Sequence, residues 1–481
     1  MKQTIKCLIA AFAAMLMSVA AIAQVTTSAL GGRVVDANGE PVVGAAVVAT
    51  HEPSGTVYGV VTNNDGRYAI NGMRAGGPYK VEISCLGYQS LTYTDVNLQL
   101  GETSALNGSL KEDSQLLGEA VVIAAPASKF SAENTGAATN ISSSQITSLP
   151  TVSRSISDVT RLSPYGGNGM SFAGSDGRTA NFTVDGANFN NNFGLNAGLP
   201  GGGTPISIDA IEEMQVVISP FDIRQTNFIG GGVNAITKSG TNKFKGTAYI
   251  YHQNQDLHGD TVAGTQIEGA RAKDMKTTYG FTLGGPIIKN KLFFFVNAEL
   301  TKQPSVVNRW RGTSVVDENG NGVADSENYV SRTTLADLER VSNFVKEKYG
   351  YDTGSWTDFP ADESNRKILA RLDWNINDNH KLAIRYNYTL NRYWQAPNKT
   401  SMDGGSRLSS ARMSKNSMSY VNSMYSQDNL VNSLSLDLNS RFTDNLSNQL
   451  LITYSKLDDA RGSSSDLFPF IDIKKDGDNY L

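Results

Sequence analysis

The stretch Arg178-Thr-Ala-Asn-Phe-Thr-Val-Asp-Gly-Ala187 is the part of the chain from which the fold is best read. Phe182 to Asp185 is typical of a strand, and Gly186 supplies a turn residue directly after it. Residues 208–218 follow, with the pattern of a helix that turns into a strand. A glycine-rich segment, Gly230-Gly-Gly-Val-Asn-Ala-Ile-Thr-Lys-Ser-Gly240, closes the set. These segments predict a mixed α/β unit in the middle of the chain.

The composition of the whole chain favours strands and turns over long helices. Charged residues make up 18 % of the 481 residues, and 19 tyrosines and 18 phenylalanines accompany only 4 tryptophans. Aromatic residues favour strands, whereas the 46 glycines favour turns. The net charge of −4 argues against a nucleic-acid partner, which would require a basic surface. The composition therefore predicts a mainly β protein.

Residues 1–23 have the parts of a secretory signal peptide. Lys2 and Lys6 supply the positive start, residues 8–22 are almost wholly apolar, and Ala21 and Ala23 suit a signal peptidase. A membrane anchor is the alternative, but the apolar run is shorter than the roughly 20 residues that a spanning helix needs. After cleavage Cys85 would be the one cysteine left in this sequence, so no intramolecular disulfide is expected.

Residues 24–112 predict a β-sandwich. Short alternating runs such as Tyr79 to Ser84 are separated by turn signals, among them Asn63-Asn-Asp-Gly66. Regular short strands with glycine-rich turns are typical of a small sandwich. The pattern resembles the carboxypeptidase regulatory-like domain that precedes some outer-membrane receptors. We interpret it as a periplasmic accessory module, with a simple spacer as the alternative.

The last half of the chain alternates apolar and polar residues with a period of two. In the run from Ile368 to Ile376, for example, every second residue is apolar. The residues between them are Leu369, Arg371, Asp373 and Asn375, of which all but the first are polar. One apolar and one polar face fits a transmembrane barrel with lipid outside and a polar lumen inside. We expect strands near residues 243–251, 277–285, 291–301, 366–376, 381–391, 431–441 and 447–456.

The connections between these expected strands discriminate a barrel from a soluble sandwich. Residues 286–290, 377–380 and 442–446 are short links, whereas residues 252–276, 302–365 and 392–430 are long ones. Strict alternation of short and long links is expected when one end of each hairpin faces the periplasm and the other faces outside. The sequence therefore predicts residues 241–481 to be the first strands of an antiparallel transmembrane barrel.

The order of the motifs resembles the plug domain of TonB-dependent outer-membrane receptors. Four segments occur in the family's order. They are Leu149-Pro-Thr-Val-Ser-Arg154, the segment quoted above around Asp185, Ile208-Asp-Ala-Ile-Glu-Glu-Met-Gln-Val-Val217, and the segment quoted above around Gly230. The segment Gly284-Gly-Pro-Ile-Ile-Lys-Asn-Lys-Leu-Phe-Phe-Phe295 resembles the first periplasmic turn of Oar-like members. The resemblance is thus to an Oar-like receptor or to one related to the SusC group. The resemblance implies a plug over residues 131–240. Because the family uses about 22 strands, we expect the chain to be the N-terminal part of a longer protein.

The resemblance also implies a partner for the linker over residues 113–130. Leu117-Gly-Glu-Ala-Val-Val-Ile-Ala124 resembles the TonB box, which pairs with TonB of the inner-membrane energising complex by strand addition. The residues expected to contact TonB are Glu119, Ala120, Val121, Val122 and Ile123. The alternative for this segment is a last strand of the sandwich.

Two further sites are predicted in loops. Plug loops of the family can touch substrate, so we expect ligand contacts at Phe189, Asn190, Asn191, Asn192 and Phe193, with a solvated loop as the alternative. Asp317-Glu-Asn-Gly-Asn-Gly-Val-Ala-Asp325 is close to a calcium-loop pattern, in which the ligands would be Asp317, Asn319, Asn321, Val323 and Asp325. Asn328 stands where a bidentate glutamate is expected, so an ordinary turn is the alternative.

The hypothesis that follows is TonB-dependent transport of an unidentified ligand across the outer membrane of a Gram-negative bacterium. The N-terminal domain and plug would lie on the periplasmic side, lipid would surround the barrel, and a surface lipoprotein partner is left open. A surface adhesin or scaffold and a secreted β protein are the alternatives. The four histidines fit no zinc helix motif, and the carboxylates have no paired context, so we do not expect an enzyme.

Overall fold

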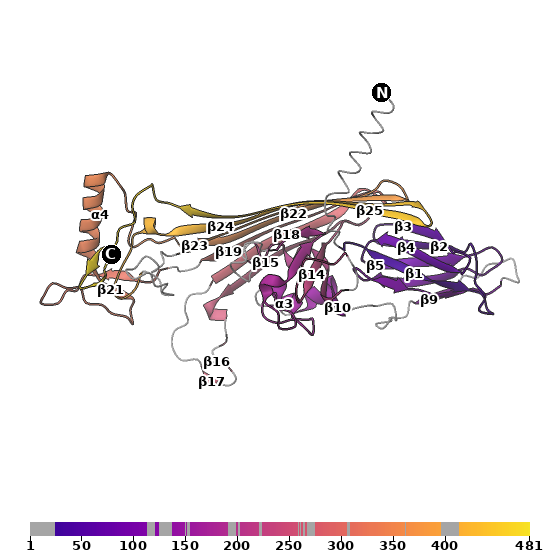
Figure 1. The fold of residues 1–481 in the computed structure, drawn as a ribbon, viewed down its shortest axis with the longest axis horizontal. Helices are drawn as coiled ribbons and strands as arrows, with labels where there is room; N and C mark the ends of the chain where they lie inside the picture. The colour runs from indigo at the N-terminus through magenta and orange to yellow at the C-terminus, as the bar shows by residue number, and fades with distance from the viewer. Residues whose placement is uncertain are drawn as a thin grey trace, which may run out of the picture.

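Figure 1 shows the computed structural model of the chain, in which three modules follow one another. An N-terminal sandwich, a plug-like α/β module and a seven-stranded sheet account for most of the elements. Among the residues that the structure describes, no helix is both long and apolar enough to cross a membrane. The signal peptide predicted over residues 1–23 lies outside these residues. The described residues are 25–112, 121–124, 137–149, 151, 154–190, 199–200, 203–220, 224–257, 259, 261–262, 265–266, 275–304, 308–360, 362–395 and 413–481.

The N-terminal module is a sandwich of two sheets around one apolar core. One sheet has the order β4 (Arg67–Met73), β1 (Ser28–Val35), β7 (Thr103–Ala105), with β8 (Gly108–Ser109) also on β1. The other has the order β3 (Thr56–Val61), β2 (Ala46–His51), β5 (Gly76–Ser84), β6 (Leu91–Leu98), β9 (Val121–Ala124). Alternate residues of each strand point into the core because successive side chains of a strand face opposite sides. The most deeply buried include Leu30, Val34, Val47, Tyr79, Val81 and Ile83.

The plug module is a five-stranded mixed sheet with short helices. Its order is β10 (Ala137–Ser142), β13 (Ile211–Ser219), β14 (Gly232–Thr237), β11 (Asn181–Val184), β12 (Ala187–Asn188), and β11 runs parallel to β14. The predicted switch from helix to strand is confirmed, since a 3-10 turn over Ile208–Ala210 leads into β13. Helices α2 (Ser143–Ser148) and α3 (Ile156–Thr160) each begin with a capping box, which satisfies their first N–H groups.

The seven-stranded sheet is an antiparallel meander in which each strand pairs with its neighbour in the chain. All seven strands predicted from the alternation are confirmed, and the last two, β24 and β25, extend furthest beyond their expected bounds. The connections 289–291, 376–379 and 444–445 are short, and the other three are long. The strands are β15 (Lys245–Asn254), β18 (Met275–Ile288), β19 (Leu292–Pro304), β22 (Asp362–Asn375), β23 (His380–Gln395), β24 (Tyr425–Thr443) and β25 (Leu446–Ser463).

The two faces of this sheet have opposite character. The side that covers the plug buries mostly polar residues, among them Asn297, Glu299, Lys367, Arg371, Asp373, Arg385, Asn387 and Asp437. The opposite side exposes large apolar residues, among them Phe281, Leu283, Ile368, Leu372, Leu434 and Ile452. Phe295, Leu369 and Val431 are inner-face exceptions that join the apolar core of the plug. This inside-out arrangement is the one expected of a barrel wall in lipid.

The modules occupy different positions along the sheet (Figure 1). The sandwich lies at the end with the short turns, and the plug packs beside it under the strands. Elements from the long connection between β19 and β22 gather at the far end: β20 (Arg311–Thr313), β21 (Val330–Thr334) and α4 (Leu335–Tyr349). The segment after β25, with β26 (Lys474–Lys475) and β27 (Asp478–Asn479), joins them there. Helix α4 begins with the Thr334 side chain as its cap and ends at Gly350, whose φ of 68° is left-handed.

Candidate functional site

The tip of the β11–β12 hairpin brings a plug carboxylate to the inner face of the sheet. Val184 pairs with Ala187, so Asp185 and Gly186 form a two-residue turn with φ of 48° and 80°. Asp-Gly is a favoured sequence for such a turn because both residues need positive φ. A Cβ atom added at Gly186 would lie 2.6 Å from the Cδ2 atom of Leu451 on β25. The glycine therefore allows the turn and its close approach to the sheet.

Two arginines of the sheet lie directly opposite one another beneath this turn. Arg371 of β22 and Arg385 of β23 are cross-strand partners, and both are buried. Like charges in this position repel, so they require carboxylates nearby. Asp373 Oδ1 lies 2.8 Å from Arg371 Nη2, and Asp437 Oδ2 lies 3.6 Å from Arg385 Nη1. Asp185 Oδ1 lies 3.3 Å from Arg385 Nε and 3.8 Å from Arg371 Nη1. The plug thus contributes one of the three carboxylates that neutralise the pair.

Thr237, the last residue of β14, holds this carboxylate in place. Its backbone N–H and its hydroxyl donate to the two carboxylate oxygens of Asp185, at 3.1 and 2.7 Å. Arg371 in turn donates to the Thr237 carbonyl oxygen. Buried charges are tolerated where ion pairs and hydrogen bonds compensate for lost water, and removing one partner leaves the others uncompensated. The plug and the sheet are therefore joined by contacts that cannot be broken one at a time without a large cost.

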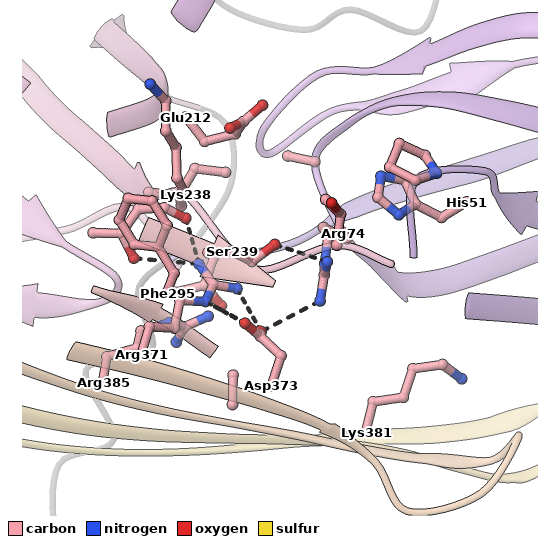
Figure 2. A pocket seen from close by; sticks show the side chains of 18 of the residues that line it. His51, Arg74, Glu212, Lys238, Ser239, Phe295, Arg371, Asp373, Lys381 and Arg385 are labelled. Carbon is pink, nitrogen blue, oxygen red and sulfur yellow. Dashed lines mark hydrogen bonds and ion pairs between the residues drawn. The ribbon is translucent and has the colours of Figure 1, made fainter. Parts of the chain in front are cut away.

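The N-terminal domain reaches the same network (Figure 2). Arg74 Nη2 lies 3.4 Å from Asp373 Oδ1, and Arg74 Nη1 donates to Ser239 Oγ at 2.8 Å. Thr26 donates its hydroxyl to Asp437 Oδ2 at 2.7 Å. These contacts border a cavity of about 410 Å³ between the three modules, lined by cationic side chains that include Lys238 and Lys381 and by Glu212 and Phe295. One buried ionic cluster therefore ties together the sandwich, the plug and the sheet.

His51 also borders this cavity, but its surroundings keep it neutral. Burial and the nearby Arg74 guanidinium lower the pKa of the imidazole to about 3. Its Nδ1 atom lies 2.6 Å from the hydroxyl oxygen of Ser54, and its ring packs on Tyr79 at 5.0 Å between centroids. The residue is thus part of the sandwich core, which agrees with its lack of a catalytic context in the sequence.

A second set of contacts joins the plug to the sheet further from the sandwich. Ser207 of the plug donates to Glu299 Oε2 on β19 at 2.8 Å, and Lys367 on β22 donates to Glu299 Oε1 at 2.7 Å. Thr389 on β23 donates to the Pro205 carbonyl oxygen at 2.7 Å. The plug segment before the 3-10 turn is therefore bound to β19 and β23, and Lys367 of β22 pairs with the same Glu299.

The sandwich also contacts the plug directly, through the turn that follows β6. The Leu100 side chain is fully buried in a small cluster. Val25 and Ala75 of the sandwich and Ile236 of the plug complete this cluster. The Leu100 N–H donates to Glu213 Oε1 at 2.9 Å, and Gln215 Nε2 donates to the Leu100 carbonyl oxygen at 2.6 Å. Two side chains of β13 thus bind both backbone groups of one residue. We call this contact the Leu100 clamp.

The ligand contacts predicted in the plug loop are only partly described. Phe189 is 1 % exposed and packs edge-on against Phe182 in the plug core, and a ligand contact at this residue stays a prediction. Asn190 accepts a hydrogen bond from the Phe182 N–H at 2.6 Å and donates to Asn181 at 2.7 Å, which is a structural role. Residues 191–193 lie outside the described residues. The alternation of aromatic and amide residues did not reveal which of them face inward.

The calcium pattern coincides with two successive turns. Asp317 Oδ1 accepts from the N–H groups of Asn319 and Asn321, and these donors lower the pKa of the Asp317 carboxyl. Asp325 accepts from the N–H groups of residues 327 and 328 in a turn of its own. Within the described ranges, no group of three or more His, Cys, Asp or Glu side chains is arranged to hold a metal ion. The turns account for the pattern of Asp317, Asn319, Asn321, Val323 and Asp325, and calcium binding stays a prediction.

Only part of the linker segment predicted to contact TonB lies among the described residues. Residues 119 and 120 lie outside the described ranges, whereas Val121 to Ala124 form β9, which pairs in parallel with β6. This is the alternative arrangement considered from the sequence, a last strand of the sandwich. A contact of Glu119 to Ile123 with TonB stays a prediction.

The ionic cluster was not identified from the sequence. Its signal was nevertheless present, because Arg371 and Asp373 occupy the polar face of a strand whose other face is apolar. Their partners Asp185 and Arg74 are distant in the chain, and only the packing of three modules brings them together. The feature that could have indicated the cluster is a pair of charged residues at alternate positions in the middle of a predicted barrel strand.

Comparisons with known proteins agree with this architecture. Residues 29–111 match the carboxypeptidase regulatory-like domain family, and residues 236–475 match an outer membrane beta barrel domain family. The TonB-dependent transporter Oar of Myxococcus xanthus is 26 % identical over 394 residues, which are 78 % of this chain and 34 % of that protein. The TonB-dependent receptor SusC of Bacteroides thetaiotaomicron is 33 % identical over 118 residues, 24 % of this chain and 10 % of that protein.

Outer-membrane receptors and transporters are among the solved structures to which the chain is similar. The siderophore receptor PirA of Acinetobacter baumannii has a TM-score of 0.40 and 17 % identity, covering 67 % of this chain and 40 % of that one. The outer membrane transporter YddB of Escherichia coli has a TM-score of 0.44 and 13 % identity, covering 68 % and 40 %.

The chain spans about a third of the length of the Oar transporter that it matches. Its mainly β fold, with an open sheet in place of a closed barrel, agrees with the fold class predicted from the sequence. Both curated relatives are receptors or transporters and not enzymes, in agreement with the sequence. The chain is an outer-membrane protein of a Gram-negative bacterium with a carboxypeptidase regulatory-like domain and an outer membrane beta barrel domain, and it is similar to TonB-dependent receptors.

Proposed function

We propose that the protein transports a ligand across the outer membrane, driven by TonB. The observation that carries the proposal is the position of the plug. It packs on the polar face of a sheet whose other face is apolar, where it would obstruct the lumen of a closed barrel. A blocked lumen needs a means of opening, and TonB, which is energised at the inner membrane, supplies one in this family.

The orientation of the chain follows from its connections. The sandwich lies beside the short turns, and short turns of outer-membrane barrels face the periplasm. The N-terminal domain and the linker would then be on the side from which TonB acts. The long connections, with α4 and β21, would face outside and meet the ligand, with or without a surface lipoprotein.

In the proposed mechanism TonB binds residues 119–123 by strand addition and pulls on the linker. The force reaches the plug through β10, the next described element of the chain after β9. Opening requires Asp185 to leave the two arginines of the sheet. Because Arg371 and Arg385 retain Asp373 and Asp437, the sheet keeps carboxylate partners when the plug moves. The cluster thus favours a closed plug and still tolerates an open one.

The test compares three strains that differ in the full-length gene: wild type, a complete deletion and a deletion of residues 117–124. The ligand is unidentified, so uptake is measured by untargeted mass spectrometry of spent medium, which reports peptides, glycans and metal chelates together. A transporter predicts that the linker deletion leaves the same compounds unconsumed as the complete deletion, although the receptor is still present in the outer membrane. If the linker deletion consumes the medium like wild type, TonB-dependent transport is excluded and an adhesin or scaffold is favoured.

A further inference from the structure

Basic side chains lie beyond the apolar band on the outer face of the seven-stranded sheet. Lys302 of β19, Arg366 of β22 and Arg392 of β23 are all exposed. The strand register places them on the same face as the exposed apolar residues. Each lies in the part of its strand that is away from the short turns and toward α4 (Figure 1). We call these three residues the cationic patch.

The pairing of the strands brings the cationic patch together. Lys302 of β19 and Arg392 of β23 both pair with Ser364, which lies between them on β22. Arg366 lies two residues along β22 from Ser364, so it is a diagonal neighbour of both other cations. Diagonal neighbours on adjacent strands lie about 7–8 Å apart, within the reach of long side chains. The three basic groups can therefore reach one ligand from three strands.

Arg366 lies at the border of the apolar band. Its direct partners on the two adjacent strands are Leu300 and Leu390, and Ile368 is the next residue on the same face toward the short turns. A long basic side chain at such a border lays its methylene groups on apolar surface and carries its charge into the headgroup region. The patch is thus at the level where lipid headgroups begin.

The patch keeps positive charge that the protein does not neutralise. Arg392 forms a bidentate pair with Asp428 of β24, at 2.7 and 2.5 Å. In the part of the chain that the structure describes, neither Lys302 nor Arg366 forms an ion pair. The carboxylate of Asp362, farther outward on the same face of β22, pairs with neither of them. Two cations at the border are therefore available to an anion.

The strands on either side do not continue the patch. On β18 the residues at this level of the face are Met275 and Thr277, which carry no charge. On β25, Lys456 lies 3.6 Å from Asp458 and is neutralised by it. The unpaired charge is local to β19, β22 and β23, which is typical of a site and not of an even belt of basic residues.

We propose that the cationic patch binds a phosphate group of lipopolysaccharide, the phosphorylated glycolipid of the outer leaflet. Lysine and arginine form strong, charge-assisted hydrogen bonds with phosphate oxygens, and basic pockets of membrane proteins bind lipid headgroups in this way. The inference rests on the orientation given under the proposed function, in which the long connections face outside. Glu299, Lys367 and Thr389 of the same three strands hold the plug segment on the inner face. The lipid would therefore brace the part of the wall that contacts the plug.

Lipid binding to the purified full-length receptor tests the proposal. The probe is lipopolysaccharide from the same organism, titrated into delipidated receptor in detergent, with bound lipid measured by native mass spectrometry. Lys302→Gln combined with Arg366→Gln should weaken binding by roughly fivefold for each cation removed. The matched control is Lys289→Gln combined with Lys291→Gln, which removes the same charge from exposed residues in the short turn between β18 and β19. It should bind the lipid like wild type.

Dephosphorylated lipopolysaccharide gives a second readout that needs no substitution. Wild type should bind it about as weakly as the Lys302→Gln, Arg366→Gln receptor binds the intact lipid. Removing the phosphates should make little difference to that double variant, because the cations that recognise them are gone. Equal binding of both lipids to wild type would overturn the proposal.

The outcomes separate this inference from the proposed function. If both double variants bind the lipid like wild type, or lose binding equally, the patch is not a phosphate site and the inference is overturned while transport stands. If the variant in the short turn alone loses binding, the short turns face the outer leaflet, and the proposed orientation fails together with the inference.

Discussion

The N-terminal sandwich and the seven-stranded sheet use the same alternation of residues in opposite ways. In β4 of the sandwich, Tyr68 and Ile70 are buried within an apolar core, whereas Arg67 is exposed, as in a soluble domain. In β22, Lys367, Arg371 and Asp373 are buried, whereas Ile368 and Leu372 are exposed. The difference teaches that alternation identifies a strand but not its inner face. Which face is buried depends on the solvent outside, water for the sandwich and lipid for the sheet.

The strongest way to break this comparison is to remove the centre of the buried polar face. Arg371→Ala would leave Asp185 and Asp373 without their shared partner, which typically costs about 3–5 kcal/mol when a buried ion pair is broken. The free energy of unfolding of the full-length receptor, from denaturant titration in detergent, should fall by that amount. Arg366→Ala, at an exposed position of the same strand, should change little. Equal losses in the two variants would contradict a buried ionic cluster.

The apolar face offers the converse test. Ile368→Arg should destabilise the receptor in a lipid bilayer by about 2–4 kcal/mol, because a cation near the bilayer centre is costly on the lipid side. Assembly in the outer membrane, seen as the heat-modifiable band on a gel, should decrease in parallel. Ile368→Leu should assemble normally. If the arginine variant assembles as well as wild type, this face is not in lipid.

The apolar part of the Leu100 clamp should matter less than the ionic cluster. Leu100→Ala removes a fully buried side chain from a cluster of four residues, and we expect a loss of about 2–3 kcal/mol, at the lower end of such substitutions. The loss should appear as faster proteolytic release of the N-terminal domain, while the barrel stays folded. Leu86→Ala, at a residue that is 99 % exposed, is the matched control. Equal proteolysis of both variants would exclude the clamp as a docking contact.

The polar part of the clamp should depend on pH. Burial raises the pKa of the Glu213 carboxyl from 4.5 to about 7, and the nearby Glu212 and Glu102 act in the same direction, whereas the Leu100 N–H opposes them. A raised pKa means that docking favours the protonated acid. Docking should be tightest below about pH 4.5 and weaken as the pH rises to about 7. Hydrogen exchange at residues 99–101 measures this change, and Glu213→Gln should flatten it. If the Glu213→Gln variant shows the same pH dependence of exchange as wild type, the dependence comes from another group.

Much of the fold could be predicted from the sequence, because strand periodicity and connection lengths are local properties. The seven strands from β15 to β25 and the switch at Ile208–Ala210 are examples. The candidate site could not be predicted, since Arg74, Asp185 and Arg371 meet only when three modules pack. Phe189 shows the limit for single residues. Its neighbours are polar, yet its ring fills the plug core, which local sequence does not reveal.

Coupling to TonB is tested most directly by photo-crosslinking in intact cells. A photoreactive amino acid would replace Val122 in the full-length receptor, and Leu86, exposed on the same domain, would carry it as the control. TonB-dependent transport predicts a covalent adduct with TonB from position 122, none from position 86, and loss of the adduct when the proton gradient is collapsed. A receptor that reaches the outer membrane but forms no TonB adduct at any position from 119 to 123 would contradict it.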